Sequence, residues 1–106
     1  MELAALGLFN DAAETFDRAL EIDPELAEAA FQKGVALHEL GRYDDALAAC
    51  EQAIAINPSY AQAWYHKGIA LAAMGRYEDA IGALDTSLQY DDANPLAYYN
   101  RGIAQI

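Results

Sequence analysis

The residue types that most often perform chemistry are few in this chain, and their spacing argues against a shared site. The chain contains two histidines, His38 and His66, and a single cysteine, Cys50. On the helices predicted below, the two histidines lie about six residues apart in level, which is about 9 Å along a helix axis. They cannot share a metal ion without distortion, and no third ligand joins them. We therefore expect two groove or surface histidines and no cofactor or metal.

The remaining candidates for catalysis also have simpler interpretations. Cys50 occupies the position that Phe16 and Leu84 hold in neighbouring copies of an internal repeat, so we expect a small buried hydrophobic residue and not a nucleophile. The pair Asp91 and Asp92 lacks the spacing of a calcium-binding loop. Because no motif supports a reaction, we predict that the chain is not an enzyme.

Composition narrows the class of partner. The chain has 106 residues, of which 55% are hydrophobic, and 17 acidic residues against 6 Lys and Arg give a net charge of −11. So acidic a chain repels phosphate backbones and anionic lipid surfaces, which excludes nucleic acid and membrane partners from our expectation. One cysteine cannot form an internal disulfide, and no signal peptide or membrane span is visible. We expect a cytoplasmic location.

An internal repeat organises the whole sequence. The stretch that begins at Gly41 recurs 34 residues later at Gly75, and a weaker form begins at Gly7. A second series, Gly34, Gly68 and Gly102, has the same period, as does the pair of prolines at 24 and 58. Residues 27–60 and 61–94 are identical at 12 of 34 positions without a gap. Two independent series with one period indicate a repeat array.

Within each unit the apolar spacing is helical. Apolar residues recur at steps of three and four, with an interruption at the glycine of positions 7, 41 and 75. Glycine there can adopt a positive φ and end a helix, so all three are predicted turn glycines. The second helix stops before Asn57, because a residue that precedes proline disfavours the helical region. Each unit is therefore predicted to be helix, turn, helix and short linker.

These features resemble the tetratricopeptide repeat (TPR) family. The family pattern of small and aromatic residues is matched in the three units by the following residues: Phe9, Ala12, Phe16, Ala19 and Pro24; Gly34, Tyr43, Ala46, Ala53 and Pro58; Trp64, Gly68, Tyr77 and Ala80. The chain departs from the pattern at Ala30, Ser87 and Asp92. The resemblance implies an all-α fold, a right-handed α-α superhelix (solenoid) of 34-residue helix-turn-helix repeats.

The small residues have a predicted packing role. Gly34 and Gly68 are expected where the two helices of a unit cross, opposite Ala46 and Ala80, because a larger side chain would separate the helices. Since a single unit buries little apolar surface, stability should come from stacking. Acids such as Asp17, Glu51 and Asp85 are expected on solvated helix faces.

The repeat frame divides residues 1–106 into a single array with four parts. These are a partial repeat at 1–26, full repeats at 27–60 and 61–94, and a partial repeat at 95–106. Full arrays usually end in polar capping helices. Their absence favours a fragment of a longer repeat protein; the alternative is a small natural protein whose ends fray or self-associate.

The resemblance also implies where a partner binds. In TPR proteins the first helices line a concave groove, and carrying the inward positions over gives an apolar and aromatic groove with an acidic edge. Phe31, Tyr65 and Tyr99 form a row at equivalent positions, and aromatic anchors of this kind suit protein recognition. The predicted groove residues are Glu28, Phe31, Val35, His38, Glu39, Tyr65, His66, Ile69, Tyr99 and Asn100. The competing interpretation is that the aromatics only pack against neighbouring first helices.

We therefore expect a protein-interaction module or scaffold that binds a basic or apolar protein or peptide. Some TPR domains hold the carboxylate of a chaperone tail with a Lys-Asn clamp, but here Phe31, Val35, Tyr65 and Ile69 occupy the clamp positions. We do not expect that ligand, because a carboxylate needs convergent donors.

The alternative is homotypic head-to-tail assembly through the incomplete terminal repeats. Its motive is four apolar residues without expected cover inside the chain: Leu3, Leu6, Ile103 and Ile106. A contact of one end with the other end of a second chain would propagate or close a ring.

Overall fold

In the computed structural model, which describes residues 3–106 and side chains from residue 5 on, the chain is entirely helical. The helices of the described part are α1 (Leu3–Ile22), α2 (Ala27–Glu39), α3 (Tyr43–Ile56), α4 (Ala61–Ala73), α5 (Tyr77–Tyr90) and α6 (Pro95–Gln105). α2 and α3 fall within residues 27–60, and α4 and α5 within residues 61–94.

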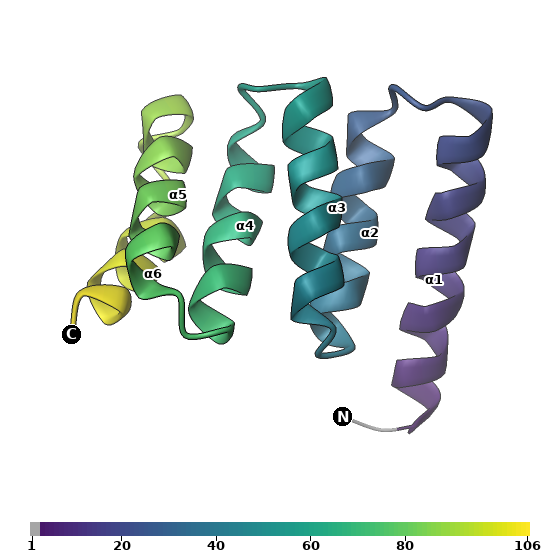
Figure 1. The fold of residues 1–106 in the computed structure, drawn as a ribbon, viewed down its shortest axis with the longest axis horizontal. Helices are drawn as coiled ribbons and strands as arrows, with labels where there is room; N and C mark the ends of the chain where they lie inside the picture. Colours follow the sequence, from purple (N-terminus) through teal and green to yellow (C-terminus); the bar gives the residue numbers. More distant parts are fainter. Residues whose placement is uncertain (1–2) are drawn as a thin grey trace.

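The helices stack one after another along the molecule, which measures 37 × 32 × 21 Å (Figure 1). Each helix packs on the next along the chain, and the first helices of successive repeats also meet, α2 with α4 and α4 with α6. This nearest-neighbour packing is that of a solenoid, in which stability is shared between repeats. The expected all-α solenoid is confirmed.

The turns inside the full repeats follow the glycines. Gly41 has φ +76° and Gly75 has φ +79°. At the first of these turns the N–H of Arg42 donates to the carbonyl of Leu37 across 2.9 Å, the six-to-one hydrogen bond that closes a helix with a left-handed glycine. The prediction of turns at Gly41 and Gly75 is confirmed.

The predicted turn at Gly7 is wrong. Gly7 lies inside α1, which continues from Leu3 to Ile22 without a break. Unlike Gly41 and Gly75, Gly7 does not have a positive φ. The residues around it are mostly Leu and Ala, which favour the helix and offset the cost of one glycine.

The linkers between repeats are set by proline and asparagine. α3 ends at Ile56. The next residue, Asn57, has a φ of −132°, which is extended as expected for a residue before proline. α6 begins with Pro95, and the side chain of Asn94 accepts hydrogen bonds from the backbone N–H groups of Leu96 and Ala97. The equivalent residues at the starts of α2 and α4, Leu26 and Tyr60, make no such side-chain cap.

The two helices of each full repeat approach too closely for any side chain at their crossing. A Cβ built on Gly34 would lie 2.9 Å from the sulfur of Cys50, and one on Gly68 would lie 2.7 Å from Cγ of Leu84. The carbonyls of Ala46 and Ala80 are each 3.3 Å from these Cβ positions. The predicted role of Gly34 and Gly68 is confirmed, as is that of Cys50 as a buried residue, with its pKa raised to about 12 by burial.

Substituting Gly68 with alanine should therefore destabilise the fold. The added methyl would overlap Leu84, which is fully buried and cannot move aside, so we expect a loss of about 1 to 3 kcal/mol in the free energy of unfolding. The matched control is Gly102→Ala, at the equivalent position of α6, where a Cβ meets nothing within 4 Å. Urea unfolding should show that variant unchanged or slightly stabilised; equal losses at both positions would contradict the close crossing.

Candidate functional site

The ten predicted groove residues all lie on first helices, namely α2, α4 and α6, but they differ widely in exposure. Glu28, Glu39 and Tyr99 are exposed, and Phe31 is buried. The others are half-buried: Val35, His38, Tyr65, His66, Ile69 and Asn100. The face of α2, α4 and α6 that carries these residues is called the first-helix face below.

Phe31 does not lie open on this face. It is 5% exposed and belongs to a hydrophobic cluster with Leu20, Ala53 and Ala63. Its ring lies 5.1 Å from the rings of both Tyr60, just before α4, and His66 of α4. The expectation of an exposed aromatic row therefore fails at Phe31, because the next repeat covers its ring.

Tyr65, at the equivalent position one repeat later, is only half-covered. The side-chain amide of Asn100 donates to its hydroxyl across 3.2 Å and to the carbonyl of Leu96 across 2.9 Å. Burial raises the pKa of the Tyr65 hydroxyl. Tyr65 and Asn100 thus lie together, and the remaining ring surface of Tyr65 stays accessible.

His66 lies between the two aromatics. Its ring centre is 5.1 Å from that of Phe31 and 5.2 Å from that of Tyr65, both edge-on. Burial, with a smaller contribution from the charge of His38, lowers the pKa of His66 from 6.5 to about 4. The Nδ1 atom of His66 is buried without a hydrogen-bond partner in the described chain. The neutral imidazole of His66 therefore packs as part of the aromatic cluster with Phe31 and Tyr65.

His38 and the two acids lie at the margins of this face. His38 packs edge-on against Tyr43 of α3, with ring centres 5.1 Å apart, and its buried Nδ1 also has no partner among the described residues. Glu28 and Glu39 are exposed near the two ends of α2. The pKa of Tyr60 is raised mainly by burial and to a smaller extent by the negative charge of Glu28.

The α6 end of the first-helix face is the most open. Four large hydrophobic side chains of this helix are at least half exposed, namely Leu96 (57%), Tyr98 (53%), Tyr99 (65%) and Ile103 (50%), and Ile106, just after the helix, is fully exposed. At the other end of the chain Leu6 is half-buried, whereas the side chain of Leu3 lies outside the described residues. Contiguous exposed apolar surface of this kind marks an interaction site.

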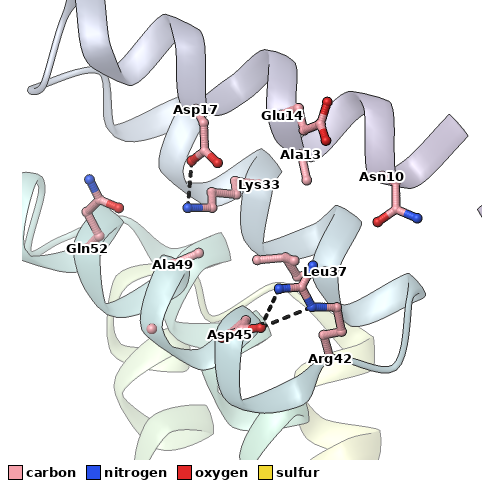
Figure 2. A pocket seen from close by; sticks show the side chains of 11 residues that line it. Asn10, Ala13, Glu14, Asp17, Lys33, Leu37, Arg42, Asp45, Ala49 and Gln52 are labelled. Carbon is pink, nitrogen blue, oxygen red and sulfur yellow. Dashed lines mark hydrogen bonds and ion pairs between the residues drawn. The ribbon is translucent and has the colours of Figure 1, made fainter. Parts of the chain in front are cut away.

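A second kind of hollow lies outside the first-helix face. A pocket of about 290 Å³ opens between α1, α2 and α3, with Leu37 and Ala49 among the residues of its wall (Figure 2). The nitrogen of Lys33 lies 2.6 Å from the carboxylate of Asp17, and Arg42 lies 2.7 Å from Asp45. Both cations at this pocket are therefore already paired within the chain.

The ion pairs of this pocket repeat along the chain. A pocket of about 400 Å³ between α3, α4 and α5 carries the pairs Lys67–Glu51 and Arg76–Asp79 at positions 34 residues later. Arg101 pairs with Asp85 one repeat further on. The side chains of Asp17, Glu51 and Asp85 are about half exposed, in keeping with the expected solvated faces, and they also bridge each second helix to the next first helix. Exposed ion pairs of this kind add little stability to the fold. They align each second helix with the next first helix and do not form a binding site.

No cluster of three or more His, Cys, Asp or Glu side chains in the described part of the chain could hold a metal ion. None of the helices formed by residues 3–106 is long and apolar enough to cross a bilayer.

Two family models with the description tetratricopeptide repeat match the sequence, one over residues 37–106 and the other over residues 1–61. The chain belongs to the tetratricopeptide repeat family. The TPR resemblance of the glycine, alanine and aromatic pattern is thereby confirmed, and the solved structures below share the fold. A search of curated proteins gave no match.

Three solved structures illustrate the likeness. The first TPR domain of Spaghetti (RPAP3), bound to the HSP90 peptide SRMEEVD, has a TM-score of 0.91 and 22% identity over 93% of this chain and 79% of that one. The second TPR domain of human RPAP3, in complex with the HSP70 peptide SGPTIEEVD, has a TM-score of 0.90 and 24% identity. This match covers 94% of this chain and 83% of that one. MamA has a TM-score of 0.87 and 33% identity over 92% of this chain and 57% of that one.

Several residues at this site were missed by the sequence reasoning. Tyr60 covers Phe31, and Leu26 and Ala29 border a hollow between α1 and α2. The signal was present in the period itself, since Leu26 and Tyr60 stand 34 residues apart. Leu26, Ala29 and Tyr60 are not at the positions that line the groove in TPR proteins, so the resemblance did not indicate them.

The lowered pKa of His66 predicts a pH dependence of stability. Because the folded pKa is about 4 and the unfolded value is 6.5, the unfolded chain takes up the proton first as the pH falls. Stability from the neutral imidazole is complete above about pH 6.5 and is lost toward pH 4, by up to about 3 kcal/mol.

Urea unfolding of the chain and of His66→Gln between pH 7.5 and 4 should isolate this effect, because the carboxylates titrate alike in both. Glutamine is a suitable replacement, since Gln32 holds the equivalent position of α2. We expect the stability advantage of histidine over glutamine to shrink as the pH falls. A difference that stays constant with pH would contradict the buried, neutral state of His66.

Proposed function

We propose that this chain is a non-catalytic protein-interaction module that binds a peptide or a segment of a partner protein along the first-helix face. The observation that carries the proposal is the run of accessible apolar and aromatic side chains across α4 and α6, above all Tyr65, Ile69 and Tyr99. Aromatic side chains supply large contact area at low entropic cost, which suits an interaction surface. The cytosolic location expected from the sequence stays a prediction.

The chemistry of the face favours a partner with basic and apolar residues. The ten predicted residues include two carboxylates, Glu28 and Glu39, and no Lys or Arg. The whole chain carries a net charge of −11, which draws positively charged segments and repels acidic ones.

The peptides of the two RPAP3 structures do not fit this face. Both peptides carry Glu and Asp residues near one end. Here the positions proposed for an anion clamp hold Phe31, Val35, Tyr65 and Ile69, and Phe31 is buried. The peptide SRMEEVD should therefore bind no better than a scrambled peptide of the same composition, by isothermal titration calorimetry. Preference for the native order with a micromolar Kd would contradict the proposal.

Selection from a random peptide library should identify the preferred ligand class. We expect enrichment of peptides that combine Lys or Arg with aromatic or aliphatic residues. Their affinity should fall by about thirtyfold in Tyr65→Ser, because loss of an aromatic anchor costs about 2 kcal/mol or more.

The control is Tyr77→Ser, which removes a tyrosine that is 52% exposed on α5, away from the first-helix face. Circular dichroism should show native helix content in both variants. Enrichment of acidic peptides, or equal affinity for both variants, would place the binding surface elsewhere.

A second candidate function is homotypic head-to-tail assembly. The exposed apolar side chains of α6, including Ile103 and Ile106, favour it. Removal of residues 95–106 should then abolish assembly, as judged by light scattering during size exclusion. An oligomer that persists after the deletion would contradict it.

A further inference from the structure

The pocket of about 290 Å³ between α1, α2 and α3, called the α1–α3 pocket below, lies between two second helices (Figure 2). α1 and α3 each pack on α2, but within the described chain they do not pack on each other. α2 therefore lies between them and carries Lys33 and Leu37 into the pocket, while α1 and α3 form its two walls.

Adjoining repeats would leave this pocket open, as the equivalent pocket one repeat later shows. That pocket lies between α3, α4 and α5, and no described residue of α1, α2 or α6 lines it. α2 is placed relative to it as the first helix of a preceding repeat would be placed relative to the α1–α3 pocket. On the other side, no described residue after Gln52 lines the α1–α3 pocket. Its openness therefore does not depend on which repeats adjoin.

The α1–α3 pocket has one carboxylate more than its cations neutralise. Lys33 is paired with Asp17, and Arg42 is paired with Asp45. Glu14 of α1 also lines the pocket, and it makes no ion pair with any other residue of the lining (Figure 2). The two ion pairs align the helices, and Glu14 is left to attract a cation from outside the chain.

The equivalent pocket between α3, α4 and α5 has no such excess. Its two carboxylates, Glu51 and Asp79, are paired with Lys67 and Arg76. The residue of α3 at the position of Glu14 is Ala48. The unpaired carboxylate thus belongs to the α1–α3 pocket alone of these two, and it is not a general consequence of the repeat.

The other groups of the α1–α3 pocket suit a particular basic side chain. Asn10 lies one turn before Glu14 on α1, and Gln52 lines the opposite wall on α3, so acceptor oxygens face the space from both sides. Leu37 and Ala49 add an apolar part of the lining. An arginine side chain combines an apolar stem with a planar head of five N–H donors, which matches this arrangement.

We propose that the α1–α3 pocket binds an arginine side chain of a partner protein, with the guanidinium on the Glu14 carboxylate and the stem against Leu37 and Ala49. A carboxylate can accept two parallel hydrogen bonds from a guanidinium, which adds specificity to the charge attraction. The net charge of −11 also draws basic segments toward the chain. The pocket lies outside the first-helix face, so this proposal goes beyond the function proposed above and does not rest on it.

An NMR titration of the isotope-labelled chain with N-acetyl-arginine amide tests the pocket directly. We expect saturable chemical-shift changes at the side-chain amides of Asn10 and Gln52, because both line the space that the guanidinium enters. N-acetyl-citrulline amide has nearly the same shape without the charge, so it should bind at least about tenfold more weakly.

Two variants with the same change of charge separate this site from the acidic surface in general. Glu14→Gln replaces an exposed residue by another good helix former, so the fold should be retained. It should weaken binding of N-acetyl-arginine amide by about tenfold. Glu78→Gln, at an exposed residue of α5 that lines neither pocket, should leave the affinity unchanged.

Three results would overturn the proposal. They are no saturable change at Asn10 and Gln52, an equal response to the citrulline compound, and equal affinities of Glu14→Gln and Glu78→Gln. Tyr65→Ser, which alters the first-helix face, should leave arginine binding intact. Loss of arginine binding in that variant would place the site on the first-helix face and contradict the pocket, whereas failure of the pocket alone would leave the function proposed above unaffected.

Discussion

The close crossing of the two helices in each repeat is the constraint on which the rest of the structure depends. At Gly34 and Gly68 there is no room for a Cβ, so each helix pair is a thin layer filled mainly by alanines and one larger residue, Cys50 or Leu84. A layer this thin buries little apolar surface of its own. The larger side chains are therefore used between repeats, where aromatics of one layer cover the start of the next.

Holding the array together and binding a partner thus draw on the same side chains. Phe31 is buried inside the array, Tyr65 is half-buried with its hydroxyl bonded to Asn100, and Tyr99 is exposed. All three occupy the same position of the repeat. His66 belongs to the array, since its ring packs against Phe31 and its Nδ1 is buried. The exposure of these equivalent aromatic side chains along the first-helix face increases from α2 to α6.

The repeat fold was predictable because its signals are local and recur. The glycine turns at 41 and 75, the glycine crossings and the proline-limited linker each have one physical cause that the period makes visible. Gly7 misled the same reasoning, because glycine permits a left-handed turn without requiring one, and the Leu and Ala residues around it favour the helix. Exposure was not predictable from position alone, because whether Phe31 is covered depends on Tyr60 in the linker before α4 and on His66 in α4. The acid–base bridges across repeats were missed for the same reason.

NMR on an isotope-labelled chain tests the central claim most directly, namely that an aromatic of one layer is covered by the start of the next first helix. The account predicts NOEs from the Phe31 ring to the methyl groups of Ala53 and Ala63 and to the rings of Tyr60 and His66. A Phe31 ring without NOEs to these residues would contradict it.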